Sequence, residues 1–76
     1  MPTFHYTVDD EPQETNAHEL TPTEILKNAE IDENSHYLVQ IEGNHRESYE
    51  DEANKTIHMH ENMKFIALSR KPTPVS

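Results

Sequence analysis

The chain contains no cysteine and no tryptophan, and it has a single glycine. Without thiols it cannot form disulfides, thiolate metal sites or a cysteine nucleophile, which fits a reducing compartment. Cations are scarce as well, since six Lys and Arg oppose fifteen Asp and Glu and leave a formal net charge of -9. This charge has the wrong sign for binding nucleic acid or an anionic membrane. It favours a monomer that is steered toward basic protein surfaces.

Long hydrophobic runs are absent too. No stretch approaches the roughly 20 apolar residues that span a bilayer, and the first residues lack the charged and apolar regions of a secretory signal. We therefore expect a cytoplasmic protein without membrane contacts. The 76 residues, of which 32% are hydrophobic, leave room for one domain with a small core.

Two segments near the start of the chain carry clear local signals. Alternation of apolar and polar residues over 4–8 predicts a strand with one buried face. The run Asp9-Asp10-Glu11-Pro12 breaks it, so a second strand is expected over 13–17. The run Leu20-Thr21-Pro22-Thr23-Glu24-Ile25 is typical of a helix start, with a capping box and a proline in the first turn. Its apolar stripe continues for about two turns.

The second half of the chain reads as strands. Residues 36–42 predict a central strand that places Tyr37, Val39 and Ile41 toward the helix and Leu38 outward. The dipeptide Gly43-Asn44 indicates a turn, followed by a weaker strand over 45–50 and an acidic loop. Two further strands are expected, and they cover residues 56–60 and 63–68.

This order of elements resembles that of ubiquitin-like proteins, most closely the small ubiquitin-like and multiubiquitin-type domains of bacterial conjugation-like operons. The segments that carry the resemblance are Phe4-His5-Tyr6-Thr7-Val8-Asp9, Leu20-Thr21-Pro22-Thr23-Glu24-Ile25-Leu26, Tyr37-Leu38-Val39, Ile57-His58-Met59-His60 and Lys64-Phe65-Ile66-Ala67-Leu68. The resemblance implies an α+β fold of the β-grasp type, a roll in which one helix crosses one face of a mixed sheet of four to five strands. This domain would occupy residues 1–69 and be followed by an extended tail over 70–76.

The resemblance also implies a protein modifier, or an interaction module derived from one. Modifiers of this kind are joined to targets through a tail that ends in Gly-Gly, whereas this tail has a different composition: Arg70, Lys71, Pro72, Thr73, Pro74, Val75 and Ser76. Three routes stay open, namely conjugation through another terminal residue, prior trimming by a protease, or binding alone. The expected partners are activating and conjugating enzymes, a protease and target proteins, with Arg70 and Lys71 against the acidic rim of an activating enzyme.

A surface for partner docking is expected on the sheet face opposite the helix. If Leu38 points outward, then Leu38, Ile66 and Leu68 form an apolar patch there, and such patches on small monomers usually mark interaction sites. Tyr49, on the weak strand at 45–50, is either an exposed anchor of this patch or a minor core residue folded under the following loop.

The histidines and the acidic pairs do not indicate a catalytic or metal site. His58 and His60 lie on one side of a predicted strand, but two imidazoles do not make the four-ligand set of a structural zinc site. The acidic pairs lack a pocket that would perturb them. We therefore predict a protein that is not an enzyme and holds no cofactor or metal. The alternative function is a small acidic inhibitor or decoy that occupies a basic groove on a nuclease or regulator, for which the net charge of -9 is the motive.

Overall fold

The computed structural model describes residues 3–70 of the chain. This part is an α+β structure whose elements are β1 Phe4–Val8, β2 Glu11–Thr15, β3 Glu19–Leu20, α1 Pro22–Asn28, β4 His36–Glu42, β5 His45–Ser48, β6 Ile57–His58 and β7 Met63–Ser69. The expected class, with a single helix, is therefore confirmed over the described residues. Within them no helix has the length and apolar character needed to cross a membrane.

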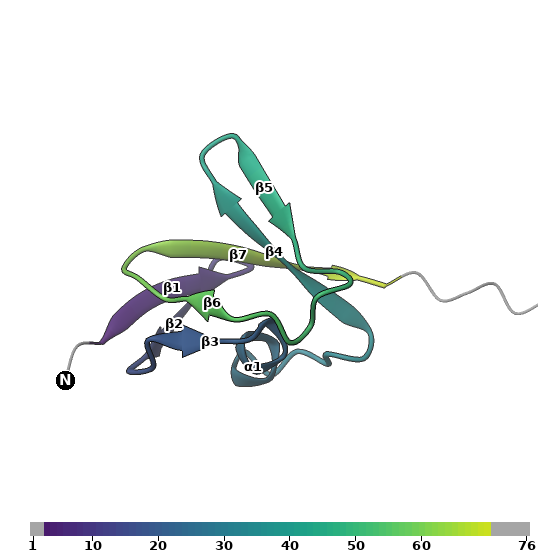
Figure 1. Cartoon of the computed structure of the whole chain (residues 1–76), viewed down its shortest axis with the longest axis horizontal. Helices are drawn as coiled ribbons and strands as arrows, with labels where there is room; N and C mark the ends of the chain where they lie inside the picture. Colours follow the sequence, from purple (N-terminus) through teal and green to yellow (C-terminus); the bar gives the residue numbers. More distant parts are fainter. Residues whose placement is uncertain (1–2, 71–76) are drawn as a thin grey trace, which may run out of the picture.

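Five strands form one mixed sheet in the order β2-β1-β7-β4-β5. β1 runs parallel to β7, and the other neighbours are antiparallel. The two short strands β3 and β6 pair separately as an antiparallel ladder. Figure 1 shows α1 and β3 on the same side of the large sheet, while the β4–β5 hairpin extends away from α1. The sheet is thus mixed and covered by one helix, as expected.

The first hairpin differs from the prediction in its second strand. Asp9 and Asp10 form a two-residue turn with positive φ angles of 52° and 67°, and Pro12 lies inside β2 opposite Thr7. Proline is tolerated here because β2 is an edge strand, where the missing N–H can point away from β1. The strand therefore begins at Glu11 and ends at Thr15, two residues before the predicted end.

The predicted start of the helix is confirmed in detail. The Thr21 hydroxyl accepts a hydrogen bond from the Glu24 backbone N–H at 3.2 Å, and the Glu24 carboxylate accepts one from the Thr21 N–H at 2.9 Å. This reciprocal capping box satisfies two donors that the first turn would leave free. At the other end, the Ile31 N–H donates to the Leu26 carbonyl at 2.9 Å, while Glu30 takes a positive φ of 61°.

The core lies between α1, the β3–β6 ladder and one face of the large sheet, which we call the core face. Phe65 is fully buried there and meets the Tyr6 ring edge to face, with centroids 5.9 Å apart. The buried cluster comprises Tyr6, Val8, Leu20, Ile25, Leu26, Leu38, Tyr49, Ile57, Met59, Met63 and Phe65. We call the opposite side of the sheet the outer face.

The orientation predicted for β4 is wrong. The register pairs Leu38 with Ala67 and Gln40 with Phe65, so Leu38 and Gln40 are on the core face and Leu38 is completely buried. Tyr37, Val39 and Ile41 consequently lie on the outer face, since successive side chains of a strand point to opposite sides. The prediction failed because alternation places the polar Gln40 on the solvent side, whereas Gln40 is only 8% exposed. Its side-chain oxygen accepts a hydrogen bond from the Tyr49 hydroxyl at 3.2 Å.

Candidate functional site

Five apolar side chains lie together on the outer face of β4 and β7. Tyr37 stands opposite Leu68, and Val39 stands opposite Ile66. We call this set the outer patch: Tyr37, Val39, Ile41, Ile66 and Leu68. Val39 is 4% exposed and lies between the partly exposed Tyr37 and Ile41 on the same face of β4, with Ile66 opposite it on β7. The patch is therefore contiguous rather than a set of isolated apolar residues.

Cationic side chains border the outer patch at both ends. Lys64 and Arg46 stand on either side of Ile41, on β7 and β5 respectively. At the other end, the Arg70 guanidinium lies over the Tyr37 ring, with its carbon 5.6 Å from the ring centroid. The chain has only six Lys and Arg, so three of them surround this one surface in an otherwise acidic protein.

No family model, curated protein or solved structure matches this chain. An apolar centre with a charged rim is the general anatomy of a protein interface.

The structure brings together two of the four residues predicted for a docking patch. Ile66 is half-buried and Leu68 is 36% exposed, and both lie on the outer face. Leu38 is completely buried on the core face, so its place in the predicted patch is wrong. Its burial follows from the register of β4 against β7, which faces it toward α1.

Tyr49 belongs to the core and not to an exposed patch. It is 6% exposed, and the Lys55 ammonium lies 6.0 Å from its ring centroid. Lys55 is held in turn by Glu47 at 3.8 Å and by Glu52 at 3.5 Å. Burial, together with the nearby Glu47, Glu52 and Glu42 carboxylates, raises the pKa of Tyr49. The tyrosine is therefore a neutral hydrogen-bond donor inside the fold.

Sequence reasoning missed that Tyr37, Val39 and Ile41 lie on the outer face, where Tyr37 and Ile41 are partly exposed and Val39 is buried. The available signal was that β4 is apolar on both faces, with Leu38 between Tyr37 and Val39. A strand of this kind is either covered on both sides or exposes an apolar face. Since the described helix covers only the core face, the second case applies to residues 3–70.

Of the predicted tail, the structure describes Arg70. Its backbone N–H donates to the Ser35 carbonyl at 2.8 Å, and its guanidinium donates to the Glu50 carbonyl at 2.9 Å. Arg70 is therefore attached to the domain by its backbone and by its side chain. The remaining predicted tail residues, Lys71, Pro72, Thr73, Pro74, Val75 and Ser76, lie outside the described residues.

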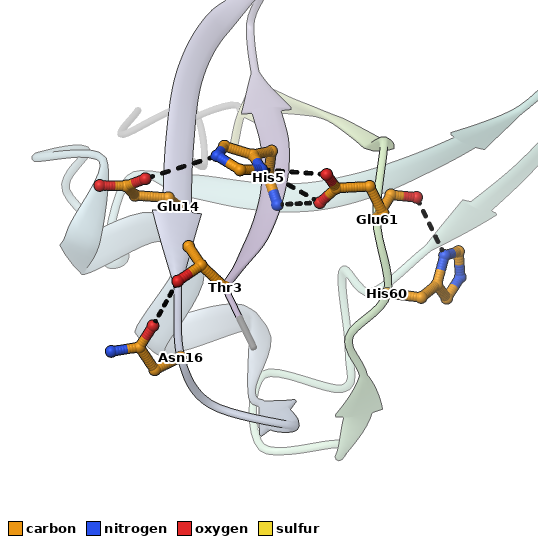
Figure 2. Close-up of polar contacts among 6 residues, drawn as sticks. All are labelled: Thr3, His5, Glu14, Asn16, His60 and Glu61. Atoms are coloured by element: carbon orange, nitrogen blue, oxygen red, sulfur yellow. Dashed lines mark hydrogen bonds and ion pairs between the residues drawn. The ribbon is translucent and has the colours of Figure 1, made fainter. Parts of the chain in front are cut away.

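A polar cluster lies on the outer face at the start of β1. Figure 2 shows the His5 ring between two carboxylates, with Nε2 3.5 Å from Glu14 and Nδ1 3.0 Å from Glu61. The Glu61 carboxylate also accepts the His5 backbone N–H at 2.5 Å. That hydrogen bond, followed by the one to the imidazole, lowers the pKa of Glu61. The cluster links β1 and β2 to the connection between β6 and β7.

The other histidines do not assemble a metal centre within residues 3–70, where no three His, Asp or Glu side chains are placed to share an ion. His58 lies 3.4 Å from its cross-strand neighbour Glu19. The His60 ring nitrogen lies 3.4 Å from the Glu61 carbonyl (Figure 2). The His58 and His60 imidazoles thus each have a local partner and do not face a shared ion.

Proposed function

We propose that this chain is a cytoplasmic ubiquitin-like protein of the β-grasp type that acts as a protein-interaction module, and that it is a modifier or derives from one. The strand order supports the fold. A parallel pair, β1 and β7, lies at the centre of the sheet, an antiparallel strand flanks each side, and α1 follows the first hairpin. These are the connections that the β-grasp requires.

The outer patch is the observation that carries the proposed binding function. It combines an apolar surface that no described helix covers with Arg46, Lys64 and Arg70 at its rim, in a chain of net charge -9. Concentration of cations around an apolar surface selects partners by charge complementarity. The partner that fits is a protein segment with apolar residues flanked by Asp or Glu. Contacts of the apolar centre would supply most of the affinity, and the rim would supply specificity.

Substitution on the outer face tests this function. A partner recovered from native cells with the wild-type protein should be lost, or weakened about tenfold or more, by Leu68→Ser or by Arg46→Glu. Glu30→Gln, which changes an exposed charge just after α1 on the other side of the sheet, is the control and should bind like the wild type. If all three variants bind equally, the outer patch is not the docking surface.

The salt dependence of partner binding distinguishes docking through the outer patch from the alternative function, an acidic decoy. Binding through the outer patch should weaken only modestly between about 50 and 200 mM salt, whereas a decoy held by its net charge should lose affinity steeply. A steep salt dependence together with full binding by Leu68→Ser would favour the decoy and contradict the proposal.

Conjugation through the tail is tested separately by intact-mass spectrometry of protein recovered from native cells. A modifier should yield adducts in which this chain, or a shortened form of it, is added to a second protein. Adducts would also identify the residue that carries the acyl bond. Recovery of the unmodified chain alone with its partners, also when activating enzymes are present, would rule out conjugation and leave the binding function in place.

A further inference from the structure

A second surface feature lies on the opposite side from the outer patch, between the β1–β2 turn and the segment that follows α1. It is a hollow of about 200 Å³ lined by Val8, Asp9, Glu11, Ala29 and Ile31. Pockets for drug-sized ligands have volumes of roughly 300–1,000 Å³, so this hollow has the size for one long side chain. We call it the acidic-rimmed hollow.

Hydrogen bonds to neighbouring elements fix both walls of the hollow. On one wall, the Asp9 N–H donates to the Phe65 carbonyl at 3.0 Å, and the Asp9 carboxylate accepts the Ala67 N–H at 3.0 Å. On the other wall, the Ile31 N–H donates to the Leu26 carbonyl at 2.9 Å. The hollow is therefore preformed, and a ligand would not have to order it.

The inner surface of the hollow is apolar, and its rim carries carboxylates. Ala29 and Ile31 pack against the core but are only partly buried, so they leave apolar surface open to a ligand. Asp9 and Glu11 supply carboxylates at the rim, and within residues 3–70 neither forms an ion pair. Lys64 on β7 lies 4.0 Å from the neighbouring Asp10 instead, and Lys27 on α1 lies 3.8 Å from Glu33.

From this combination we infer that the acidic-rimmed hollow receives a lysine or arginine side chain from a basic segment of a partner protein. Such side chains lay an aliphatic stem on apolar surface and keep the charged head in contact with water and anions. The stem would contact Ala29 and Ile31, and the head would lie between the Asp9 and Glu11 carboxylates. The net charge of -9 would attract a basic segment to the molecule, and the Asp9 and Glu11 carboxylates would direct its side chain to the hollow. This partner chemistry is opposite to that of the outer patch, so the two surfaces can be occupied independently.

Nuclear magnetic resonance titration of the full chain with an N-acetylated tetralysine amide tests the inference. Saturable shifts are expected for the amides of Val8, Asp9, Ala29 and Ile31. Acetylating the four lysine side chains of the peptide should abolish these shifts. Glu11→Gln should weaken binding about threefold, which is the effect expected for one exposed charge pair.

Glu50→Gln is the matched control, because it removes the same charge at an exposed position outside the hollow. It should leave the shifts at the hollow within experimental error of the wild type. If the shifts spread over all acidic loops, or if both variants weaken binding equally, tetralysine is held by net charge alone and the inference is wrong. Loss of binding at the hollow would leave the outer patch untouched, so the two proposals fail separately.

Discussion

The two faces of the large sheet differ in the side chains that β4 contributes and in what covers them. On the core face, β4 contributes Leu38 and a buried polar residue, Gln40, which is satisfied by Tyr49. On the outer face, the same strand contributes Tyr37, Val39 and Ile41, which is a more apolar set, and the described residues leave it uncovered by any helix. The face with the more apolar strand is thus the surface and not the interior. Stability resides on the core face, and we expect recognition to reside on the outer face.

A pair of leucine substitutions tests this division most strongly. Leu38 is 0% exposed and Leu68 is 36% exposed, on neighbouring strands but opposite faces. Leu38→Ala should lower the free energy of unfolding by about 2–5 kcal/mol, because it removes buried methyl groups and leaves a cavity. Leu68→Ala should cost about 1 kcal/mol or less. Urea denaturation of both variants measures the two values. Equal losses would contradict the assignment of Leu38 to the core face.

The hydrogen bond between Tyr49 and Gln40 gives the next largest effect. Tyr49→Phe removes the donor and leaves the Gln40 oxygen buried without a partner, which should cost about 1–3 kcal/mol. Adding Gln40→Leu to Tyr49→Phe should restore most of the lost stability, since the unsatisfied group is then removed as well. A double-mutant cycle by urea denaturation provides the coupling energy. Strictly additive losses would show that the two side chains do not depend on each other.

This same pair explains why the orientation of β4 could not be predicted from the sequence. Alternation places the three apolar residues Tyr37, Val39 and Ile41 on one face, which favours them as the core set. Burial of Gln40 depends on a hydroxyl nine positions away on the other side of a turn, and periodicity carries no information about that partner. Local signals did better at the helix, where the contacts of Thr21 and Glu24 are only three residues apart.

Long-range pairing was the other part that the sequence did not reveal. The predicted strand over 56–60 reduces to Ile57–His58, and its partner is Glu19–Leu20 rather than the large sheet. Met59 extends this contact through its N–H, which donates to the His18 carbonyl at 2.8 Å. The candidate site was found in part for the same reason. Ile66 and Leu68 followed from the local pattern, whereas their neighbours depended on the register of β4.

Arg70, at one end of the outer patch, tests whether a substitution on the outer face leaves the core face unchanged. Arg70→Ala removes the guanidinium from the Glu50 carbonyl and from the Tyr37 ring, and we expect a loss of about 1 kcal/mol. The Tyr37 ring resonances should shift, whereas those of the buried Tyr6 should not. Nuclear magnetic resonance of the variant checks both. Shifts that appear equally on Tyr6 would mean that the change is transmitted through the core and is not confined to the outer face.

The smallest effect is expected at the polar end of the outer face. Glu61 has a lowered pKa in the folded protein because the His5 N–H and ring hold its carboxylate. Stabilisation of this kind is complete above the ordinary value of 4.5 and is lost as the pH falls through the lowered, folded-state pKa. Glu61→Gln should therefore be less stable than the wild type at pH 7, and the difference should shrink below pH 4.5. Urea midpoints at the two ends of this range measure it.

Glu50→Gln, an exposed carboxylate outside this cluster, is the control for Glu61 and should show no comparable change with pH. A difference between Glu61→Gln and the wild type that stays constant from neutral to acid pH would mean that the carboxylate does not gain stability from His5.

Photo-crosslinking in native cells tests the central claim, that the outer face is the docking surface, most directly. A benzophenone side chain is placed at Leu68 on the outer face or, in a second variant, at the exposed Lys27 on α1. The account predicts a discrete adduct with a partner protein from position 68 and none from position 27. Adducts from position 27 alone, or none from position 68 in cells where the partner is recovered with the wild type, would contradict it.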